Sequence, residues 1–349
     1  MTNDILYNLK VKASDEYPVF IGKKILSRTG ELISKSLSKC KICLITDDKV
    51  DALYSEQVIN SLKAQGYAVV KYVFKNGEKS KNLSTYGKIL NFLAENQLTR
   101  TDAIVALGGG VVGDMAGFVA STYLRGIKYV QIPTTLLAQI DSSVGGKTAI
   151  DLDGGKNLVG AFCQPIMVIC DVDVLNTLPP QIFQDGMGEV AKYAILDKKI
   201  FNLLKDTTRS LIELIYMCID YKRKIVEEDE FESGNRRLLN LGHTPAHGIE
   251  KLSKYRIPHG KAVVMGLDII LNSSLKNKLL SKQDYENIIK VISQHVKLEK
   301  SPYWIDDICR ACLQDKKRSG DTIRLIMVYG IGDCRAVSVG INELKEYLS

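Results

Sequence analysis

Residues 102–114 read Asp-Ala-Ile-Val-Ala-Leu-Gly-Gly-Gly-Val-Val-Gly-Asp, which predicts a buried strand, a glycine turn and a helix in succession. The apolar run lacks polar alternation, as is typical of a parallel strand covered on both faces. Glycines at 108–110 let the backbone approach a diphosphate, and the helix N-terminus offers unpaired N–H groups there. Because the spacing is not GxGxxG, a purely structural tight turn stays open as the alternative.

Further apolar runs on both sides of this stretch alternate with helical patterns. Strands are predicted at 42–46, 68–74, 103–107, 129–132 and 167–170, with helices at 55–65 and 83–95. This alternation indicates βαβ units and a parallel sheet. Residues 142–162 are rich in glycine and are predicted to form a loop.

Beyond Pro180 the apolar residues recur with the 3.6-residue period of helices. Helices are predicted over 181–196, 200–226, 236–252, 261–277 and 282–295, and two β-branched runs follow at 323–328 and 336–339. We therefore expect two domains. Residues 1–180 would form an α/β, Rossmann-like nucleotide-binding domain, and residues 181–349 a mainly α-helical domain.

The composition, 45% hydrophobic and 25% charged, is that of an ordinary globular protein. No apolar run approaches the roughly 18 residues of a membrane span, and the first residues lack the pattern of a signal peptide, so we expect a cytoplasmic location. The lysines and arginines behind the net charge of +7 stand singly in polar or glycine-rich motifs. That distribution argues against nucleic-acid binding and favours a small anionic substrate.

Eight cysteines include two pairs with the spacing of metal ligands, Cys40/Cys43 and Cys309/Cys312. The first pair runs into a predicted strand and the second lies on an amphipathic helical pattern. A zinc site is one interpretation of each pair. The surroundings favour the other, which is buried free thiols in a reducing compartment.

Three of the four histidines, His243, His247 and His259, fall in one short window. Histidine is the usual imidazole ligand of zinc and titrates near neutral pH, so the window indicates a metal or proton-transfer site. Helix capping and core hydrogen bonding are the alternatives. One polar helix face is predicted from spacings of four, three and four residues between Arg236, Asn240, His243 and His247.

Polar residues also follow predicted strands. Asp47 comes directly after the strand at 42–46, where a carboxylate can bind a ribose, and residues 76–81 follow the next strand. The segment 133–148 ends like an ATP-binding P-loop, but Asp141 stands where the first glycine is required, which excludes that site.

Cations recur in the same motifs. Lys147 and Lys156 lie among glycines and suit a cation held against a phosphate. Lys192 stands three residues after Glu189, hence on the same helix face, where a surface ion pair is the simplest interpretation.

Together these segments resemble the 3-dehydroquinate synthase family, from about Asp47 to Lys317. The motifs that carry the resemblance are GGGVVGDMAGF (108–118), PTTLLAQIDSSVGGKT (133–148), GKNLVGAF (155–162), GEVAKY (188–193) and LNLGHTPAHGIE (239–250). The resemblance implies an NAD-binding domain followed by a metal- and substrate-binding domain.

The resemblance also implies roles for individual residues. The metal ligands, for zinc or cobalt, would be Glu189, His243 and His259. NAD contacts would come from Asp47, Asn76, Gly77, Glu78, Lys79, Ser80, Lys81, Gly110, Val111, Val112, Gly113, Asp114, Thr134, Thr135, Asp141, Lys147 and Lys156. The catalytic and substrate-binding residues would be Arg125, Lys147, Asn157, Lys192, Lys222, Arg236, Asn240, His247 and Lys316. Arg125 would reach the neighbouring active site of a homodimer.

The implied reaction converts 3-deoxy-D-arabino-heptulosonate 7-phosphate to 3-dehydroquinate and phosphate, a step of the shikimate pathway. It proceeds by transient oxidation with NAD, β-elimination of phosphate, reduction, ring opening and intramolecular aldol closure. Two departures from the family pattern, Pro245-Ala246 before His247 and Gly188 before Glu189, remove no functional group but could shift the helix that presents the histidines.

Three other functions stay open. A sugar-phosphate cyclase of the same fold would make an inosose or a valiolone, but the substrate contacts named above agree with dehydroquinate synthase. A metal-dependent alcohol dehydrogenase, such as a glycerol dehydrogenase, would accumulate NADH. A non-catalytic regulatory module would require the metal-ligand set to be vestigial.

Overall fold

The structure is a computed structural model that describes residues 4–206, 208–312, 318–319 and 321–349. It divides into two units. Unit 1 comprises Met1–Leu178 together with Lys222–Glu230, and unit 2 comprises Pro179–Tyr221 together with Phe231–Ser349. Residues 222–230, which we expected in the second domain, therefore group with the first.

A seven-stranded sheet forms the centre of unit 1, in the order β1-β2-β9-β6-β5-β3-β4. β1 pairs with β2 antiparallel, and every other pair is parallel. The five predicted strands are present to within one residue at each end. The strands are β1 (Ile5–Lys12), β2 (Glu16–Gly22), β3 (Lys41–Asp47), β4 (Ala68–Phe74), β5 (Ala103–Gly108), β6 (Lys128–Pro133) and β9 (Met167–Asp171).

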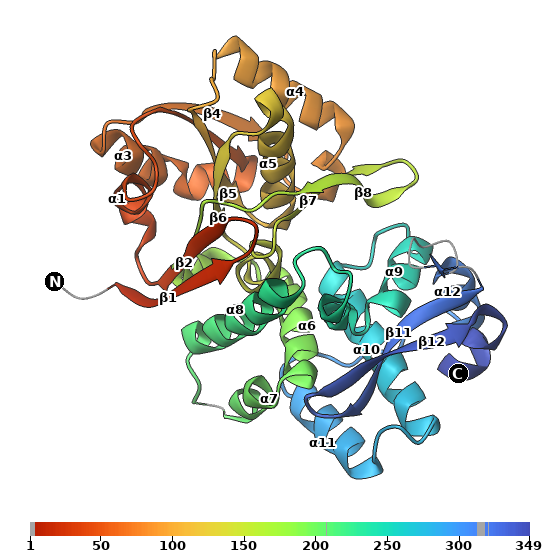
Figure 1. The fold of residues 1–349 in the computed structure, drawn as a ribbon. Helices are drawn as coiled ribbons and strands as arrows, with labels where there is room; N and C mark the ends of the chain where they lie inside the picture. Colours follow the sequence, from red (N-terminus) through yellow and green to blue (C-terminus); the bar gives the residue numbers. More distant parts are fainter. Residues whose placement is uncertain (1–3, 207, 313–317, 320) are drawn as a thin grey trace. The chain divides into compact units, whose positions relative to one another are not determined.

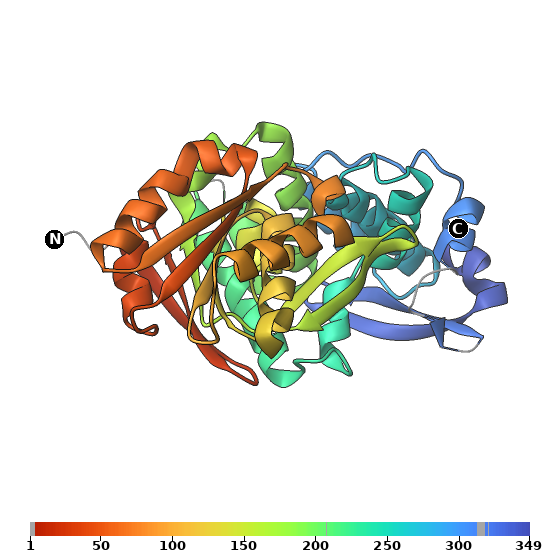
Figure 2. The ribbon, with the colours of Figure 1, turned by 90° about the horizontal axis from the view of Figure 1, so that it is seen from above.

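Helices cover both faces of this sheet (Figures 1 and 2). Alternate residues of β3 point to opposite sides: Ile42 and Leu44 join one apolar cluster, Cys43 and Ile45 the other. The first cluster includes side chains of α1 (Thr29–Ser34) and α3 (Glu56–Ala64), the second those of α4 (Leu83–Glu95) and α5 (Gly110–Thr122). Uninterrupted apolar runs are therefore required in these strands.

The direction of the connections reverses between β3 and β5. From β3 the chain passes to β4 on one side, whereas from β5 it passes to β6 on the other. Such a reversal opens a crevice at the carboxyl ends of the two strands, where α/β sheets bind ligands. Asp47 and Gly108 are the last residues of β3 and β5 and therefore mark the carboxyl ends at this reversal.

The predicted loop over residues 142–162 is wrong in its second part. β7 (Lys147–Leu152) and β8 (Gly155–Phe162) form an antiparallel hairpin, which Figure 1 shows reaching away from the sheet of unit 1. The hairpin packs on α5 through Gly117, where a Cβ would lie 2.4 Å from Cγ2 of Thr148. Its glycine-rich sequence concealed the alternation of buried and exposed residues.

Unit 2 is mainly helical, with a small antiparallel sheet. The helices are α6 (Pro180–Leu196), α7 (Lys198–Lys205), the first part of α8 (Leu211–Glu228), α9 (His243–Leu252), α10 (His259–Lys276), α11 (Lys282–Ile292), α12 (Ile305–Cys312) and α13 (Leu344–Leu348). The strands are β10 (Arg318–Ser319), β11 (Thr322–Gly330) and β12 (Asp333–Gly340). The long helix predicted over 200–226 is therefore two helices.

The helix predicted over 236–252 is also interrupted. Asn235–Asn240 form a 3-10 helix, and Gly242, with φ of 76°, separates it from α9. The prediction that Arg236 and Asn240 share one helical face with His243 is therefore wrong, because a left-handed residue redirects the chain between them. A Cβ at position 242 would lie 2.9 Å from Cδ2 of Leu267, so only glycine fits this turn.

All eight cysteines are free thiols. Burial raises the pKa of Cys43 to about 12 and that of Cys309 to about 11, as is usual for unreactive buried thiols. Neither CxxC pair belongs to a group of three or more metal-capable side chains in the described part of the chain. No described helix is both long enough and apolar enough to cross a membrane.

Candidate active site

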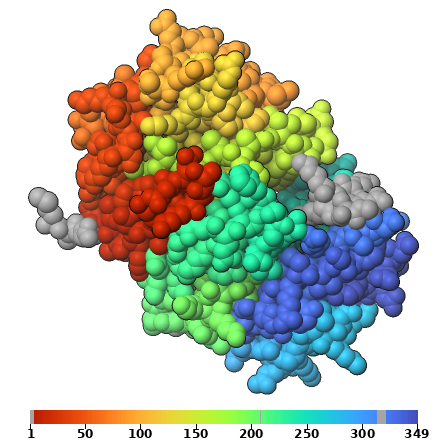
Figure 3. All heavy atoms as spheres, viewed as in Figure 1, coloured from red at the N-terminus to blue at the C-terminus, as the bar shows by residue number. Residues whose placement is uncertain are grey.

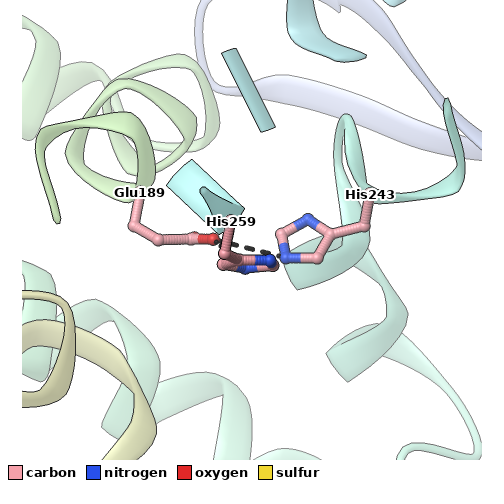
Figure 4. A group of neighbouring side chains, drawn as sticks. All are labelled: Glu189, His243 and His259. Atoms are coloured by element: carbon pink, nitrogen blue, oxygen red, sulfur yellow. Dashed lines mark hydrogen bonds and ion pairs between the residues drawn. The ribbon is translucent and has the colours of Figure 1, made fainter. Parts of the chain in front are cut away.

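Glu189, His243 and His259 converge from three helices of unit 2 (Figure 4). Oε1 of Glu189 lies 3.3 Å from Nε2 of His243 and 3.1 Å from Nε2 of His259. Two ligand atoms that each bind a tetrahedral zinc at about 2.0–2.1 Å are about 3.3 Å apart. Both oxygen–nitrogen distances therefore fit a shared metal ion, and all three donor atoms lie within 4.8 Å of one another. Two nitrogens with one carboxylate leave a coordination position for a substrate oxygen.

Local structure presents each imidazole. His243 is the first residue of α9, and His259 is the first of α10. Nδ1 of His243 lies 3.1 Å from the carbonyl oxygen of Leu241. With its hydrogen on Nδ1 donated to that carbonyl, the ring keeps the lone pair of Nε2 for a metal.

Charges around Glu189 keep it ionised although it is fully buried. Burial alone would raise the pKa of Glu189, but Lys192, His243 and His259 together lower it well below its usual value. Burial lowers the pKa of His243 to about 4, against the opposing effect of Glu189. For His259 the effect of burial is outweighed by Glu189 and Glu250, which raise its pKa to about 10.

Lys192 is buried, with 1% of its surface exposed, and forms an ion pair with Oε2 of Glu189. The prediction that Lys192 and Glu189 form a surface ion pair is therefore wrong in its location, because the pair is buried. An ammonium group at this depth is costly unless it is paired, and here the partner is a metal-capable carboxylate. Lys192 thus brings a fixed positive charge to the metal-ligand group.

Four further residues of the second domain were expected at the site: Arg236, Asn240, His247 and Lys316. His247 is half-buried on α9, and its ring centroid is 5.7 Å from that of His243. Arg236 is buried. The amide of Asn240 donates to the carboxylate of Glu232, a residue that the sequence analysis missed. Lys316 lies outside the described residues.

A second polar cluster forms in unit 1 around Lys81. Its Nζ lies 2.5 Å from Oδ2 of Asp114 and 2.5 Å from Oδ1 of Asn157. Burial would lower the pKa of Lys81, but Asp114 and Glu78 raise it, so the side chain is a cation. Lys156 contacts Glu78 at 3.4 Å. The β4–α4 loop, α5 and the β7–β8 hairpin thus meet, and Asn157, expected to contact substrate, lies among residues expected to contact NAD.

Most of the other expected NAD contacts lie at or after the carboxyl ends of β3 to β6, where the connections reverse, whereas Lys147 is the first residue of β7. Pairing aligns Thr46 with Leu107 and Gly108 with Pro133, so the loops after these strands are neighbours. A Cβ at Gly109 would lie 2.9 Å from Cγ2 of Thr135, which explains the glycine. Asp47 accepts hydrogen bonds from the backbone N–H of residues 49 and 50, and therefore also caps a helix.

Two further cations of the expected set differ in their surroundings. Nζ of Lys222, which belongs to unit 1, lies 2.5 Å from Oδ1 of Asp141 and donates to its carbonyl oxygen at 2.6 Å. Arg125 is exposed beyond the C-terminus of α5, at the opposite end from Gly110. Leu124 and Arg125 have φ of 51° and 70°, a costly backbone for residues with side chains.

Comparisons with known proteins cover almost the whole chain. Sequence profiles described as 3-dehydroquinate synthase N-terminal and 3-dehydroquinate synthase C-terminal match residues 71–185 and 186–318. The 3-dehydroquinate synthase of Streptococcus thermophilus is 42% identical over 351 positions, which cover 98% of this chain and 98% of that protein.

Solved structures confirm the fold class. A crystal structure of 2-deoxy-scyllo-inosose synthase complexed with carbaglucose-6-phosphate, NAD+ and Co2+ has a TM-score of 0.86 at 24% identity, over 98% of this chain and 99% of the other. A 2-epi-5-epi-valiolone synthase from Streptomyces hygroscopicus with NAD+ and Zn2+ bound has a TM-score of 0.85 at 23% identity, over 98% of both chains. At these identities the two likenesses show the fold alone.

Proposed function

This chain belongs to the 3-dehydroquinate synthase family, and from that premise we propose that it converts 3-deoxy-D-arabino-heptulosonate 7-phosphate to 3-dehydroquinate and phosphate. The observation that carries the proposal is the convergence of Glu189, His243 and His259 beside buried Lys192. In reaction class the enzyme is a carbon–oxygen lyase that eliminates phosphate and closes a carbocycle.

The cofactors we propose are NAD and one divalent metal, zinc or cobalt. When bound, NAD supplies a reversible hydride acceptor and the metal polarises a substrate oxygen. Glu189, His243 and His259 would hold the metal, because the Glu189 oxygen has the spacing of tetrahedral zinc ligands from each imidazole nitrogen, and all three donor atoms lie within 4.8 Å of one another. The loops after β3 to β6 and the Lys81 cluster would hold NAD, because they follow the carboxyl ends of strands at a reversal of connectivity.

The substrate carries a carboxylate and a phosphate, and this chain supplies cations for both. Buried Lys192 and Arg236 keep positive charge in a low-dielectric interior, where an enolate that forms during elimination is stabilised more than in water. The other proposed cationic substrate contacts are Lys147, Lys222 and Lys316. His247 is half-buried one helical turn from His243, where an imidazole can pass protons to and from ring oxygens.

A homodimer is also part of the proposal, with Arg125 reaching the phosphate in the neighbouring active site. Two features support this role. Arg125 is exposed at the end of α5, and it has no hydrogen bond or ion pair to other described residues. The left-handed backbone at residues 124 and 125 is a local strain that functional sites often carry.

The test is phosphate release by purified protein supplied with the heptulosonate phosphate, catalytic NAD+ and a divalent metal. We expect phosphate and 3-dehydroquinate in equal amounts with no accumulation of NADH, because the hydride is returned. Accumulating NADH would indicate an alcohol dehydrogenase, and turnover of a different sugar phosphate would indicate another cyclase. Folded, metal-loaded protein that releases no phosphate would refute the proposal.

A further inference from the structure

Two carboxylates outside the metal-ligand group make contacts at His259 and at the two residues that follow it. One comes from α6 and contacts the backbone at the start of α10. The other comes from α9 and contacts the imidazole ring. Neither role was visible in the sequence motifs, and each is carried by separate contacts.

Asp185 supplies the N-terminal cap that α10 lacks. The first N–H groups of a helix have no partner within it, and Pro258, the residue before His259, has no side-chain acceptor. Oδ1 of Asp185 instead accepts from the backbone N–H of Gly260 at 2.6 Å and of Lys261 at 3.2 Å. Asp185 lies one helical turn before Glu189 on α6. This turn of α6 therefore presents one metal ligand, Glu189, and also caps α10, which begins with another, His259.

The backbones of α6 and α10 touch at this point. A Cβ added at Gly188 would lie 2.3 Å from the carbonyl oxygen of Gly260, and a Cβ at Gly260 would lie 1.7 Å from the carbonyl oxygen of Asp185. Paired glycines therefore let the two helices cross without intervening side chains. Gly188, noted above as a departure from the family pattern, has a structural reason in this chain.

Glu250 faces the ring of His259. It is buried, with 3% of its surface exposed, and its Oε1 lies 3.4 Å from Nδ1 of His259, whereas Nε2 faces Glu189. A hydrogen on Nδ1 directed at Glu250 leaves the lone pair of Nε2 for the metal, which is the arrangement that carboxylates impose on metal-binding histidines. Glu250 follows His243 by seven residues, two turns along the same face of α9.

We propose that Asp185 and Glu250 are positioning residues for the metal ligand His259. Asp185 fixes the backbone from which the ring projects, and Glu250 fixes the ring orientation and tautomer. The inference rests on the proposed metal site, so its test must separate a failure of the site from a failure of these two residues.

The experiment measures cobalt(II) affinity of metal-free protein by competition with a chromophoric chelator, together with the visible spectrum of the bound cobalt. We expect Glu250→Ala and Asp185→Ala to bind cobalt about 10–100-fold more weakly and with a shifted spectrum. Glu250→Gln and Asp185→Asn, which keep an acceptor oxygen but not its charge, are expected to fall between the alanine variants and the parent protein.

Asp197→Ala is the matched control. Asp197 caps α7 in the same unit by accepting from the backbone N–H of Lys199 and Ile200, but it does not touch a metal ligand. The Asp197→Ala substitution is expected to lower the midpoint of unfolding and to leave the affinity for cobalt unchanged. His247→Ala is likewise expected to retain cobalt, since His247 is outside the ligand group.

His259→Ala separates the outcomes. If this variant binds cobalt like the parent protein, the proposed metal site is wrong. If it loses cobalt while Asp185→Ala and Glu250→Ala bind normally with unchanged spectra, the site stands and the positioning roles are overturned. Should an alanine variant not fold, the Gln and Asn variants decide: several-fold weaker affinity is expected, and parental affinity overturns the inference.

Discussion

His243 and His247 stand one helical turn apart, a spacing that by itself suggests a chelating pair. In the structure only His243 lies with Glu189 and His259. A helical pattern shows which side chains share a face, but not which other helix that face meets, so spacing could not divide the pair. For the same reason the sequence did not reveal Glu250 and Asp185, although each lies on the face of a helix that also carries a metal ligand.

The fourth histidine, His295, lies away from this group and offers a pH-dependent test of stability. Its Nε2–H donates to the carbonyl oxygen of Leu204 at 2.8 Å, and its Nδ1 accepts from Nη2 of Arg209 at 3.1 Å. Partial burial and the charge of Arg209 lower the pKa of His295. A second proton, on Nδ1 of His295, would face the positive guanidinium of Arg209 and would remove the lone pair that accepts its hydrogen bond.

Proton linkage determines whether protonation of His295 raises or lowers the stability of the folded protein. As pH falls through about 6.5, the unfolded chain takes up a proton at residue 295 before the folded protein does, so stability is lost. We expect the urea midpoint to fall less between about pH 7.5 and about pH 5.5 in His295→Gln, which keeps a donor and an acceptor but does not titrate. Equal falls in both proteins would show that His295 makes no contribution.

Among the secondary-structure elements, buried strands were predictable and turns through glycine were not. β3, β4, β5, β6 and β9 are continuous apolar runs because helices cover both faces of the sheet. The β7–β8 hairpin escaped prediction because it has partly exposed strands and many glycines. The break at Gly242 was missed because the residues on both sides keep a helical period.

The crossing of α6 and α10 yields a prediction for stability. Gly260→Ala places a Cβ 1.7 Å from the carbonyl oxygen of Asp185, so the helices must separate. Overpacking of this kind costs about 1–3 kcal/mol in the free energy of unfolding, measurable by urea denaturation.

Gly87→Ala is the control for that substitution. Gly87 lies in α4, and a Cβ there meets no atom within 4 Å. Because alanine loses less backbone entropy on folding, this variant should be more stable by about 0.5–1 kcal/mol. Changes of the same sign in the two variants would contradict the steric explanation.

At the scale of the whole molecule, the two proposed cofactors bind different units. All three metal ligands belong to unit 2, whereas every proposed NAD contact belongs to unit 1. A ligand stabilises the part of a protein that it binds, by about 2.7 kcal/mol at 100 times its Kd.

Amide hydrogen exchange can map this division. Removal of metal with a chelator is expected to speed exchange at the starts of α9 and α10. Added NAD+ is expected to slow exchange in the loops that follow β3 to β6. The assignment of cofactors to units would be reversed if metal removal sped amide exchange in the loops of unit 1 instead. It would also be reversed if NAD+ slowed amide exchange only in unit 2.

Unit 1 also includes a segment far along the chain. Its N-terminal hairpin, red in Figure 3, contacts the end of α8 and the residues that follow it. The backbone N–H of Lys12 donates to Glu227, and Ser14 donates to Glu230 through both its N–H and its hydroxyl. The side-chain amide of Gln164 donates to the same carboxylate of Glu230. These contacts explain why residues 222–230 group with unit 1.

This arrangement constrains the order in which the protein can be built. A ribosome that has released residues 1–178 has not yet made the segment that receives the hydrogen bonds of Lys12, Ser14 and Gln164. Unit 1 can be completed only after residue 230 has emerged, when part of unit 2 is already outside the exit tunnel. During synthesis, residues 1–178 therefore remain without these hydrogen bonds until residues 222–230 have been translated, together with the first part of unit 2.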